Sequence, residues 1–156
     1  MRLSNREVTG FADIVGILNR CDTVRLGING GEFPYVVPVS FGFEADGGRI
    51  AIYFHGAKEG LKHELLEKDR RVCVEADVFH RYAVNEEKRI LTAEYESVIG
   101  FGTAETVSGK EAEKGLALIC AHAGFENFSC GSEKALLATR VYKIELRSFT
   151  GKRRFV

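Results

Sequence analysis

The sequence has no tryptophan, one methionine and two prolines, and it carries no excess charge of either sign. Its 22 Lys and Arg residues balance 22 Asp and Glu residues, which argues against a domain that holds nucleic acid through bulk charge. No apolar run approaches the roughly 18 residues of a membrane helix, and the first residues lack the apolar core of a signal peptide. We therefore expect a cytoplasmic protein that binds neither nucleic acid nor membrane.

Cysteines and catalytic motifs are also sparse. Cys21, Cys73, Cys120 and Cys130 include no C-x-x-C pair, whereas a structural zinc site needs closely spaced thiolates and imidazoles. Disulfides are uncommon in the cytosol, so we expect four reduced thiols and no metal site. The sequence also has no G-x-S-x-G elbow and no H-E-x-x-H helix, so an enzyme built on this chain is expected to rely on a cofactor.

The apolar residues recur mainly with the period of two that is typical of β-strands. Glycine-containing turns at Asn29–Gly31 and Asp46–Gly48 separate alternating segments, as in hairpins. A succession of hairpins excludes a doubly wound parallel sheet. We therefore predict a single mainly β (α+β) domain over residues 1–156, a six-stranded antiparallel barrel with peripheral helices. The predicted strands cover residues 24–28, 34–43, 49–55, 72–78, 94–106 and 142–146.

Helical periodicity is confined to a few segments. An i, i+3, i+4, i+7 stripe of apolar residues predicts a helix over 11–19, with Thr9 as its candidate N-cap. Ser108 and Glu111 form a capping box that opens another helix, to about residue 123. The polar segment 80–92 follows neither period and is predicted to be a loop. Shorter helical pieces are expected at 58–67 and 132–137.

The segment Tyr53–Lys62 passes from a strand through a small-residue turn into a helix. A helix N-terminus presents free backbone N–H groups and the positive end of the helix dipole, which together suit a phosphate group. Lys58 and Lys62 lie about one turn apart, so their ammonium groups could reach the same anion. The pattern also fits a solvated helix with ordinary surface lysines, and His55 at the strand end is either a bystander or a catalytic group.

Three further segments could offer backbone or charge to a ligand. Alternate residues from Val36 to Gly42 form a small, flat face, which suits either a planar ring or an edge strand packed by a helix or a second subunit. Gly100 and Gly102 permit either close backbone approach or strong strand curvature. The basic tail 152–154 could hold a phosphate or be a solvated end.

Four strings follow one another along the chain: P-Y-V-V-P-V-S-F-G-F-E at 34–44, I-Y-F-H-G-A-K-E-G-L-K at 52–62, Y-E-S-V-I-G-F-G at 95–102 and F-T-G-K-R at 149–153. In this order they resemble the pyridoxamine 5′-phosphate oxidase-like flavoproteins, and more narrowly the nitroimidazole-resistance (Nim-type) branch. The resemblance covers nearly the whole chain, and its most specific piece is the second string. It implies a split β-barrel whose two subunits together form two FMN sites at their interface.

The resemblance implies four groups of cofactor-binding residues. The first lies beside the isoalloxazine ring with its backbone at the polar edge, the second borders the ring and ribityl chain, the third holds the phosphate, and the fourth approaches from other strands, of the same or the partner subunit. In that order they are Val37, Pro38, Val39 and Ser40; Phe54, His55, Gly56 and Ala57; Lys62; and Ser97, Val98 and Lys152. His55 matches the family's histidine near the flavin and is the candidate catalytic residue.

The sequence departs from the family pattern in three places. Leu61 stands where relatives commonly have an arginine, so phosphate binding would depend on Lys62 alone. The segment 79–90 is atypical, which leaves the substrate side of the pocket undefined. Gly115 and Cys120 are small for their helix, so we expect looser packing there.

The resemblance favours a homodimeric FMN-dependent oxidoreductase that passes a hydride from NAD(P)H to the flavin and reduces a small-molecule acceptor, such as a nitroaromatic compound. Three alternatives remain open. The protein could bind or carry flavin without turnover of its own, or the same barrel could hold a deazaflavin, or it could hold heme with His55 or His63 as axial ligand. A dimer is also expected on physical grounds, because a strand with Gly, Pro and a flat face exposes a backbone edge that needs a cover.

Overall fold

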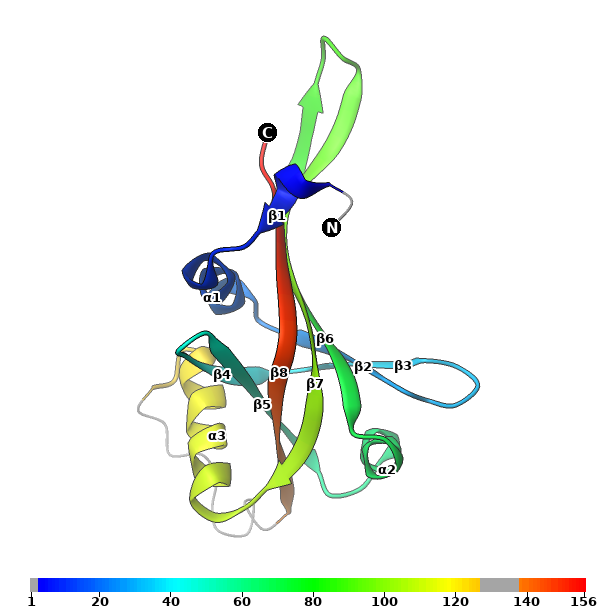
Figure 1. Cartoon of the computed structure of the whole chain (residues 1–156), viewed down its shortest axis with the longest axis vertical. Coiled ribbons are helices and arrows are strands. Elements are labelled where there is room, and N and C mark those ends of the chain that lie inside the picture. The colour runs from blue at the N-terminus through cyan, green and yellow to red at the C-terminus, as the bar shows by residue number, and fades with distance from the viewer. Residues whose placement is uncertain (1–2, 127–137) are drawn as a thin grey trace.

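The computed structural model describes residues 3–126 and 138–156. The predicted helical piece at 132–137 lies outside these residues. Three helices accompany the sheet: α1 (Phe11–Arg20), α2 (Leu61–Lys68) and α3 (Gly109–His122), preceded by a 3-10 turn at Ser4–Arg6 (Figure 1). None of the described helices is both long and apolar enough to cross a membrane.

All strand pairs of the described sheet are antiparallel, in the order β3-β2-β6-β7-β8-β5-β4, with β1 paired to β8. This confirms the mainly β class, but the sheet has eight strands and the predicted number of six is wrong. The predicted strand over 34–43 is divided at Ser40, and a two-residue strand near the N-terminus was too short to produce a periodic signal. The strands are β1 (Glu7–Val8), β2 (Val24–Ile28), β3 (Tyr35–Val39), β4 (Phe41–Asp46), β5 (Arg49–Ala57), β6 (Arg71–Asn85), β7 (Ile90–Val107) and β8 (Thr139–Arg154).

The two ends of this strand order are neighbours in sequence. β3 pairs with β2 alone among the described strands, and β4 with β5 alone, yet Ser40 is the single residue between β3 and β4. The sheet therefore turns back on itself at Ser40, and both of its free edges start there. Pro38, which has no N–H group, lies in one of these edge strands, as expected for proline in a sheet.

The interior of the sheet is filled by rows of side chains that cross several strands. One row pairs Val39 with Val24, Val24 with Ala76, Ala76 with Val98 and Val98 with Gly151, and all five residues are buried. Residues paired across an antiparallel sheet point to the same face. The interior face is therefore continuous from the edge strand β3 to the C-terminal strand β8, and α1 packs against β6, β7 and β8.

Helix α3 lies directly on β4 and β5 because two glycines leave room for it. A Cβ atom at Gly42 would overlap the backbone of Leu118 and Ile119, and one at Gly115 would lie 2.7 Å from Cδ1 of Tyr53. The expectation of looser packing at Gly115 is therefore wrong, because the missing side chain lets the helix approach the buried Tyr53 closely.

The predicted helix caps are also corrected. The residue before α1 is Gly10, not Thr9, and it makes no side-chain capping bond. Ser108 is the N-cap residue of α3, but its side chain makes no capping bond either. Glu111 does not reach back to Ser108: it accepts a 2.6 Å hydrogen bond from the Tyr53 hydroxyl and a 3.0 Å bond from Lys143 Nζ. The tertiary partners of Glu111 therefore replace the local capping box.

One cysteine expectation fails. Cys21 and Cys73 are free thiols, but Cys120 is disulfide-bonded. Cys130 lies outside the described residues. The expectation of four reduced thiols rested on cellular compartment, which does not bear on whether two sulfur atoms lie close together in the fold.

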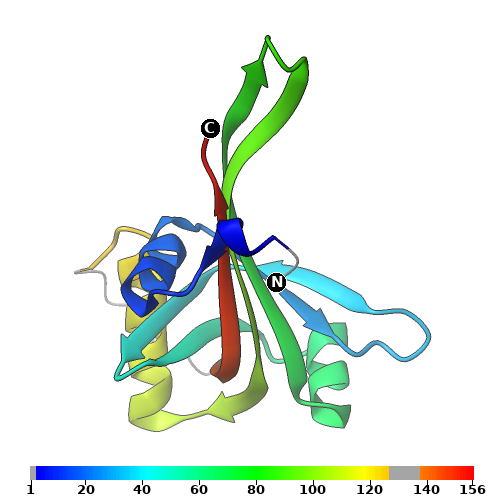
Figure 2. The same ribbon diagram turned by 45° about the horizontal axis from the view of Figure 1, so that its top comes forward.

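The segment 80–92 is not a loop, because β6 and β7 continue through it as a two-stranded arm that projects beyond the rest of the molecule (Figures 1 and 2). The pairing runs to Asn85 and Ile90, next to the turn. A bulge at His80 shifts the register between Phe79 and Arg81, and this shift interrupts the alternation that would have indicated a strand.

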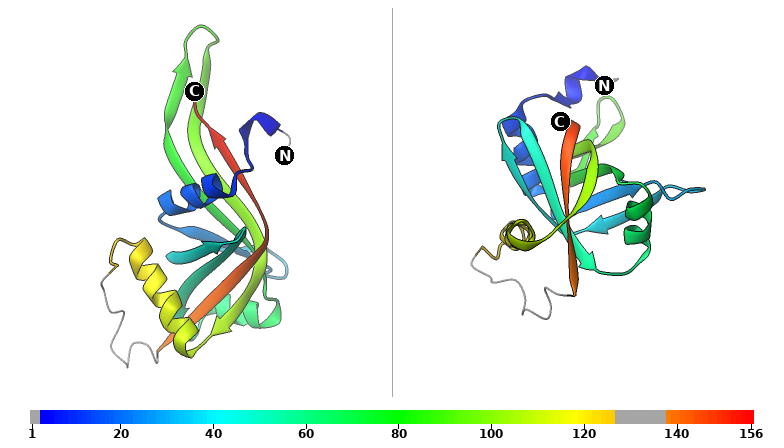
Figure 3. Two further views of the ribbon diagram at one scale, coloured as in Figure 1. Left: turned by 60° about the vertical axis from the view of Figure 1, so that its left-hand side comes forward. Right: turned by 60° about the horizontal axis from the view of Figure 1, so that its bottom comes forward.

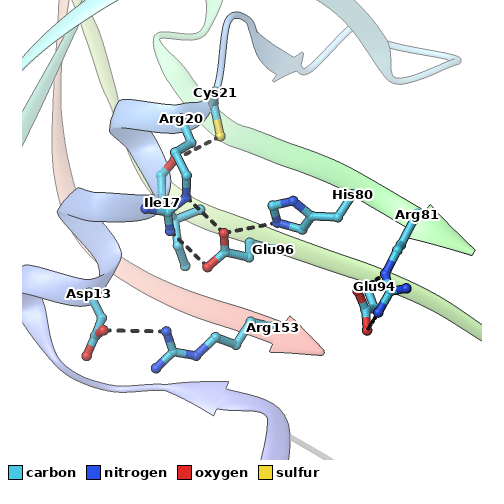
Figure 4. Close-up of polar contacts among 9 residues, drawn as sticks. All are labelled: Asp13, Ile17, Arg20, Cys21, His80, Arg81, Glu94, Glu96 and Arg153. Carbon is cyan, nitrogen blue, oxygen red and sulfur yellow. Dashed lines mark hydrogen bonds and ion pairs between the residues drawn. The ribbon is translucent and has the colours of Figure 1, made fainter. Parts of the chain in front are cut away.

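The root of the arm is fixed to the body by a buried carboxylate (Figure 4). Glu96 is 2% exposed and accepts two hydrogen bonds of 2.9 Å from Arg20, at the end of α1. Nε2 of His80, the bulge residue, lies 3.2 Å from the same carboxylate. Glu96 therefore joins α1, β6 and β7 where the arm leaves the barrel, a junction that Figure 3 shows from two other sides.

We predict that Glu96→Gln lowers the free energy of unfolding by about 1–3 kcal/mol, because a buried charge-assisted pair loses its charge while its volume is kept. Urea denaturation followed by circular dichroism measures this change. Glu75→Gln is the matched control, since Glu75 pairs with Arg25 at the surface and exposed ion pairs contribute little. Equal destabilisation by both substitutions would contradict the anchoring role of Glu96.

Candidate functional site

The best-defined candidate site lies where β5 ends and α2 begins. Phe54 is buried and pairs across the sheet with Phe41 on one side and Tyr142 on the other. Its ring stacks on that of Tyr142, with centroids 4.9 Å apart and planes 4° from parallel. This stack supports the last part of β5, which stays paired with β8 as far as Ala57 before the chain turns into α2.

A small cradle lies on the inner side of this strand end, at Gly56. A Cβ atom there would lie 2.5 Å from Nζ of Lys62 and 3.5 Å from Nε2 of His63. Nζ of Lys62 is also 6.0 Å from the centroid of the Phe54 ring. The Lys62 side chain therefore fills the space that the missing side chain leaves, and the imidazole of His63 lies beside it.

His63 is the least solvated polar residue of this cradle. It is 2% exposed, its Nδ1 lies 2.9 Å from the Tyr142 hydroxyl, and its ring stacks on the Tyr142 ring. Nη1 of Arg140 donates to the same hydroxyl at 3.4 Å and to Glu67 at 2.9 Å. Nε2 of His63 is buried, and the ring also interacts with the backbone of Ala57.

The electrostatics of the cradle favour neutral imidazoles beside a cation. Burial lowers the pKa of Lys62. Desolvation, and then the Lys62 charge, lower the pKa of His55. Burial is also the main cause that lowers the pKa of His63, followed by the charges of Lys62 and Arg140, while the Ala57 backbone and Glu67 act in the opposite direction. The cradle therefore holds net positive charge that no described carboxylate neutralises at the Gly56 position itself.

His55 itself is exposed, and neighbouring side chains of a strand alternate between its two faces, so it lies on the opposite face of β5 from Phe54. Ala57 ends the strand and is exposed. The predicted group Phe54–Ala57 is thus one short stretch at the end of β5 whose alternate members face the core and the surface.

The predicted ring-side residues lie on the edge strand β3 and at the Ser40 corner. Val37 and Val39 turn their side chains toward the interior, while Pro38 and Ser40 are exposed. The outer backbone edge of β3 has no described strand beside it. Ser40 precedes Phe41, the partner of Phe54, so the structure brings this group close to the end of β5.

The structure does not bring Ser97, Val98 and Lys152 to this place within one chain. Ser97 pairs with Lys152, whereas His55 pairs with Val141, eleven residues earlier on β8 and about 36 Å away along a strand. The side chain of Val98 is 2% exposed and belongs to the core, so any contact that it makes to a ligand has to use its backbone.

Sequence reasoning missed the part played by Tyr142 and Arg140 in this site. Both come from β8, whose alternating pattern indicates a half-exposed strand and carries no motif. Their link to the site follows from the pairing of Tyr142 with Phe54, which is a tertiary fact. The sequence offers His63 only as an alternative heme ligand, and no sequence pattern indicates that its ring is buried.

The chain belongs to the pyridoxamine 5′-phosphate oxidase family, whose sequence profile matches residues 12–153. Among solved structures it is similar to a candidate 5-nitroimidazole antibiotic resistance protein from Bacteroides thetaiotaomicron, with 28% identity over 94% of this chain and 86% of that one and a TM-score of 0.82.

More distant structures share the fold. A flavocytochrome from Azotobacter vinelandii has 19% identity and a TM-score of 0.82, and the match covers 100% of this chain and 72% of that one. A FAD- and heme-binding protein from Mycobacterium smegmatis has 15% identity and a TM-score of 0.84, over 97% and 74% of the two chains. No curated protein sequence matches the chain significantly.

We predict that Lys62→Met raises the pKa of both His55 and His63, because it removes a positive charge that disfavours each imidazolium. Burial is unchanged, so both values should stay below the ordinary value of about 6.5. Titration of the histidine Cε1–H signals by NMR measures the shift, and Lys68→Met, at the far end of α2, should move neither signal.

The lowered pKa values of His55 and His63 also predict that stability depends on pH. Because the folded-state pKa values are lowered, the unfolded chain takes up protons first as the pH falls through about 6.5, and the free energy of unfolding should decrease in that range. For the Lys62→Met prediction above, unchanged pKa values of His55 and His63 in the NMR titration would contradict the position of the Lys62 ammonium group.

Proposed function

We propose that the protein is an FMN-dependent oxidoreductase whose flavin phosphate is held between Lys62 and the N-terminus of α2. The observation that carries the proposal is the strand-to-helix junction at Gly56, where the partly buried Lys62 ammonium group lies over the glycine at the first turn of α2. An anion fits this place, because a cation lies beside the free backbone N–H groups of a helix N-terminus. Membership of the pyridoxamine 5′-phosphate oxidase family and the flavoprotein structural relatives support the choice of a flavin nucleotide.

The other predicted residues would contact the ring and the ribityl chain of the flavin. The free backbone edge of β3, from Val37 through Pro38 and Val39 to Ser40, would meet the polar edge of the ring. Phe54 would support the site from the core side, and Gly56 and Ala57 would leave room for the ribityl chain. When bound, the flavin supplies the hydride-accepting chemistry.

His55 is the proposed catalytic residue. Its side chain is exposed at the end of β5, and its lowered pKa keeps the imidazole neutral near pH 7. A neutral imidazole can hold or release a proton at a ring nitrogen as a small acceptor is reduced. NAD(P)H as hydride donor and a nitroaromatic compound as acceptor complete the proposal, and the similarity to the candidate 5-nitroimidazole resistance protein supports that acceptor class.

We further propose that two copies form the complete site. Large apolar side chains, 41–70% exposed, continue along one outward face from the barrel into the arm. They share this face because Leu91, Ile99 and Phe101 are alternate residues of β7, and Phe101 pairs with Cys73, Cys73 with Gly27 and Gly27 with Val36. The arm side chains on this face are Phe79, Tyr82, Val84 and Leu91.

Exposed apolar side chains gathered on one face are typical of an interaction surface, and here the ion pairs of Arg25 with Glu75 and Asp77 lie among them. A two-stranded ribbon is also marginally stable in water by itself. Ser97 and Lys152 form a cross-strand pair on this same face, far along β8 from His55. A second copy packed on the face would therefore bring its own β5–α2 site near residues that a single chain keeps apart, which is the reason for proposing an interface site.

The cofactor proposal predicts a yellow protein. After purification and desalting, we expect a flavin absorption spectrum and a released cofactor with the mass of FMN. Lys62→Met should weaken FMN binding about 10–100-fold, the range for one lost charged hydrogen bond, without affecting riboflavin, whereas Lys68→Met should bind FMN normally. A colourless protein that takes up no FMN would overturn the proposal, and NAD(P)H oxidation with a nitro acceptor no faster than with free FMN would favour a flavin carrier.

The dimer proposal predicts a molecular mass of two chains by size-exclusion chromatography with light scattering. Phe101→Glu should shift the protein toward one chain, because a charge would be buried in the interface. Phe125→Glu is the matched control, since Phe125 is 62% exposed but lies beyond α3 and off this face. A stable FMN-bound monomer of the wild type would exclude the two-subunit site.

A further inference from the structure

The foot of the arm carries a cleft that the proposed function does not use. It lies between the 3-10 turn at Ser4–Arg6, the arm and the C-terminal end of β8 with the residues that follow it (Figures 1 and 2). Its volume is about 540 Å³, and we call it the arm cleft. Among the described residues no Asp or Glu lines it, whereas four cationic residues do: Arg6, Lys88, Arg153 and Arg154.

Strand pairing explains why a cleft is open at this place. β8 ends at Arg154, which pairs with Tyr95, so the part of β7 that continues into the arm has no described strand on that side. β1 pairs with β8 just before this end, and the pairing holds the 3-10 turn beside it. Val156 has left the sheet, and its backbone N–H donates to Glu94 at 2.9 Å. The two ends of the described chain therefore form walls of the cleft, and the arm forms another.

The cleft is positively charged because the carboxylates around it are engaged elsewhere. Glu94 is 5% exposed and accepts hydrogen bonds of 2.7 and 3.1 Å from Arg81. Asp13 reaches Arg153 at 3.5 Å, and an exposed pair of this kind contributes little. The other three cations of the cleft form no ion pair with a described carboxylate. A carboxylate at Val156 would still leave the lining positive.

Tyr95 indicates a positive potential at the foot of the cleft. Burial raises the pKa of its hydroxyl, but hydrogen bonds from Lys152 and Arg6 outweigh burial, so the pKa lies below the ordinary value of about 10. Nζ of Lys152 also lies 5.3 Å from the centroid of the Tyr95 ring. Arg154 is the cross-strand partner of Tyr95, which adds a third cation at the same place. An anion at the foot would therefore meet guanidinium groups that no described carboxylate already holds.

We propose that the arm cleft is a ligand site separate from the β5–α2 junction, and that it binds a small molecule through a phosphate group held at the foot by Arg6 and Arg154. A guanidinium group presents two parallel N–H donors that match two oxygens of one phosphate, so a pair of them suits this dianion. The body of the ligand would extend along the arm toward Lys88, past the apolar side chains of Ile90 and Phe155, which are 47% and 56% exposed.

This site depends neither on the proposed flavin nor on the proposed dimer. Ile90 and Thr92, which line the cleft, alternate along β7 with Leu91 of the apolar outward face, so the cleft and that face lie on opposite sides of the arm. Within one chain Arg154 lies thirteen residues along β8 from Val141, which pairs with the end of β5. Phosphate binding in the cleft would therefore survive a failure of FMN binding.

The first test uses inorganic phosphate as the probe, with isothermal titration calorimetry of the protein as purified. Arg154→Gln should weaken phosphate binding about tenfold, because one charged hydrogen bond is lost. Arg147→Gln is the matched control, since it removes the same charge from an exposed position of β8 outside the cleft. Lys62→Met should leave this binding unchanged, which separates the cleft from the proposed flavin site.

The wild-type protein provides a second readout that does not depend on a variant folding. In ¹H–¹⁵N NMR spectra, the side-chain Nε–H signals of Arg6 and Arg154 should shift on addition of phosphate, while that of Arg147 should stay in place.

The phosphate group can belong to a free phosphorylated small molecule or to NADPH, and competition separates the two sources. Displacement of inorganic phosphate by NADPH but not by NADH would identify the 2′-phosphate of the dinucleotide. Displacement by neither, with phosphate still bound in the cleft, would identify a free phosphorylated molecule. Only the first source rests on the proposed function, because NADPH is there the hydride donor.

Three results would overturn the proposal: equal phosphate affinity of wild type and Arg154→Gln, loss of phosphate binding in Lys62→Met, or unmoved Nε–H signals of Arg6 and Arg154. Binding of a single-stranded oligonucleotide that phosphate does not compete with would also overturn it, because the cleft would then be a nucleic-acid surface.

Discussion

The architecture depends on one covalent constraint at Ser40. The strand order begins with β3 and ends with β4, and these two strands are separated by one residue. A flat sheet would hold its two outermost strands several strand spacings apart, so this link forces the sheet to curve until its ends meet. It also leaves β3 with an unpaired backbone edge next to the end of β5, because Phe41 pairs directly with Phe54. The corner and the candidate site therefore arise from the same link.

The curvature has to be accommodated elsewhere in the sheet, and glycines do so. On β7, a Cβ atom at Gly102 would overlap the backbone of β8, and one at Gly100 would lie 2.8 Å from a methyl group of Leu146. The register between β7 and β8 shifts at this point. On the opposite wall, Gly42 and Gly115 allow α3 to cover β4 and β5 closely, so Tyr53 is buried beneath the helix. Small residues thus act where backbones approach, and large ones fill the interior rows between them.

Regular periodicity was a reliable guide to local structure, and interrupted periodicity was not. The period of two predicts a strand over 24–28, and β2 occupies Val24–Ile28. The apolar stripe over 11–19 predicts α1, which ends one residue later, at Arg20. The arm escaped prediction because the bulge at His80 breaks the alternation and because both faces of a projecting ribbon meet solvent within one chain.

In the candidate site too, local patterns could be predicted from the sequence and tertiary contacts could not. The strand-to-helix junction with Gly56 and Lys62 could be located from local sequence, since a small-residue turn before a helix is a local pattern. Tyr142 and Arg140 could not, because they reach His63 through strand pairing over nearly 80 residues of sequence. Ser97 and Lys152 are a third case: the sequence pattern groups them with the site, whereas the register of β8 separates them from it within one chain.

That separation and the apolar outward face are two consequences of the long pair of β7 and β8. The pair runs from the β5–α2 junction at one end to the arm at the other, and Ile99 and Phe101 lie near its middle. A twofold axis near the middle, crossing the strands, would place the arm end of each copy over the junction end of the other, because such an axis exchanges the two ends. The turn of the arm carries Glu86 and Glu87 beside Lys88 and Arg89, so its charge is balanced and does not select between axes. An axis along the strands would stack the two arms on each other and would leave Ser97 and Lys152 away from both β5–α2 junctions. Of the two axes, only the one that crosses the strands would meet the proposal that two copies form the complete site, with the arm of each copy against the junction of the other.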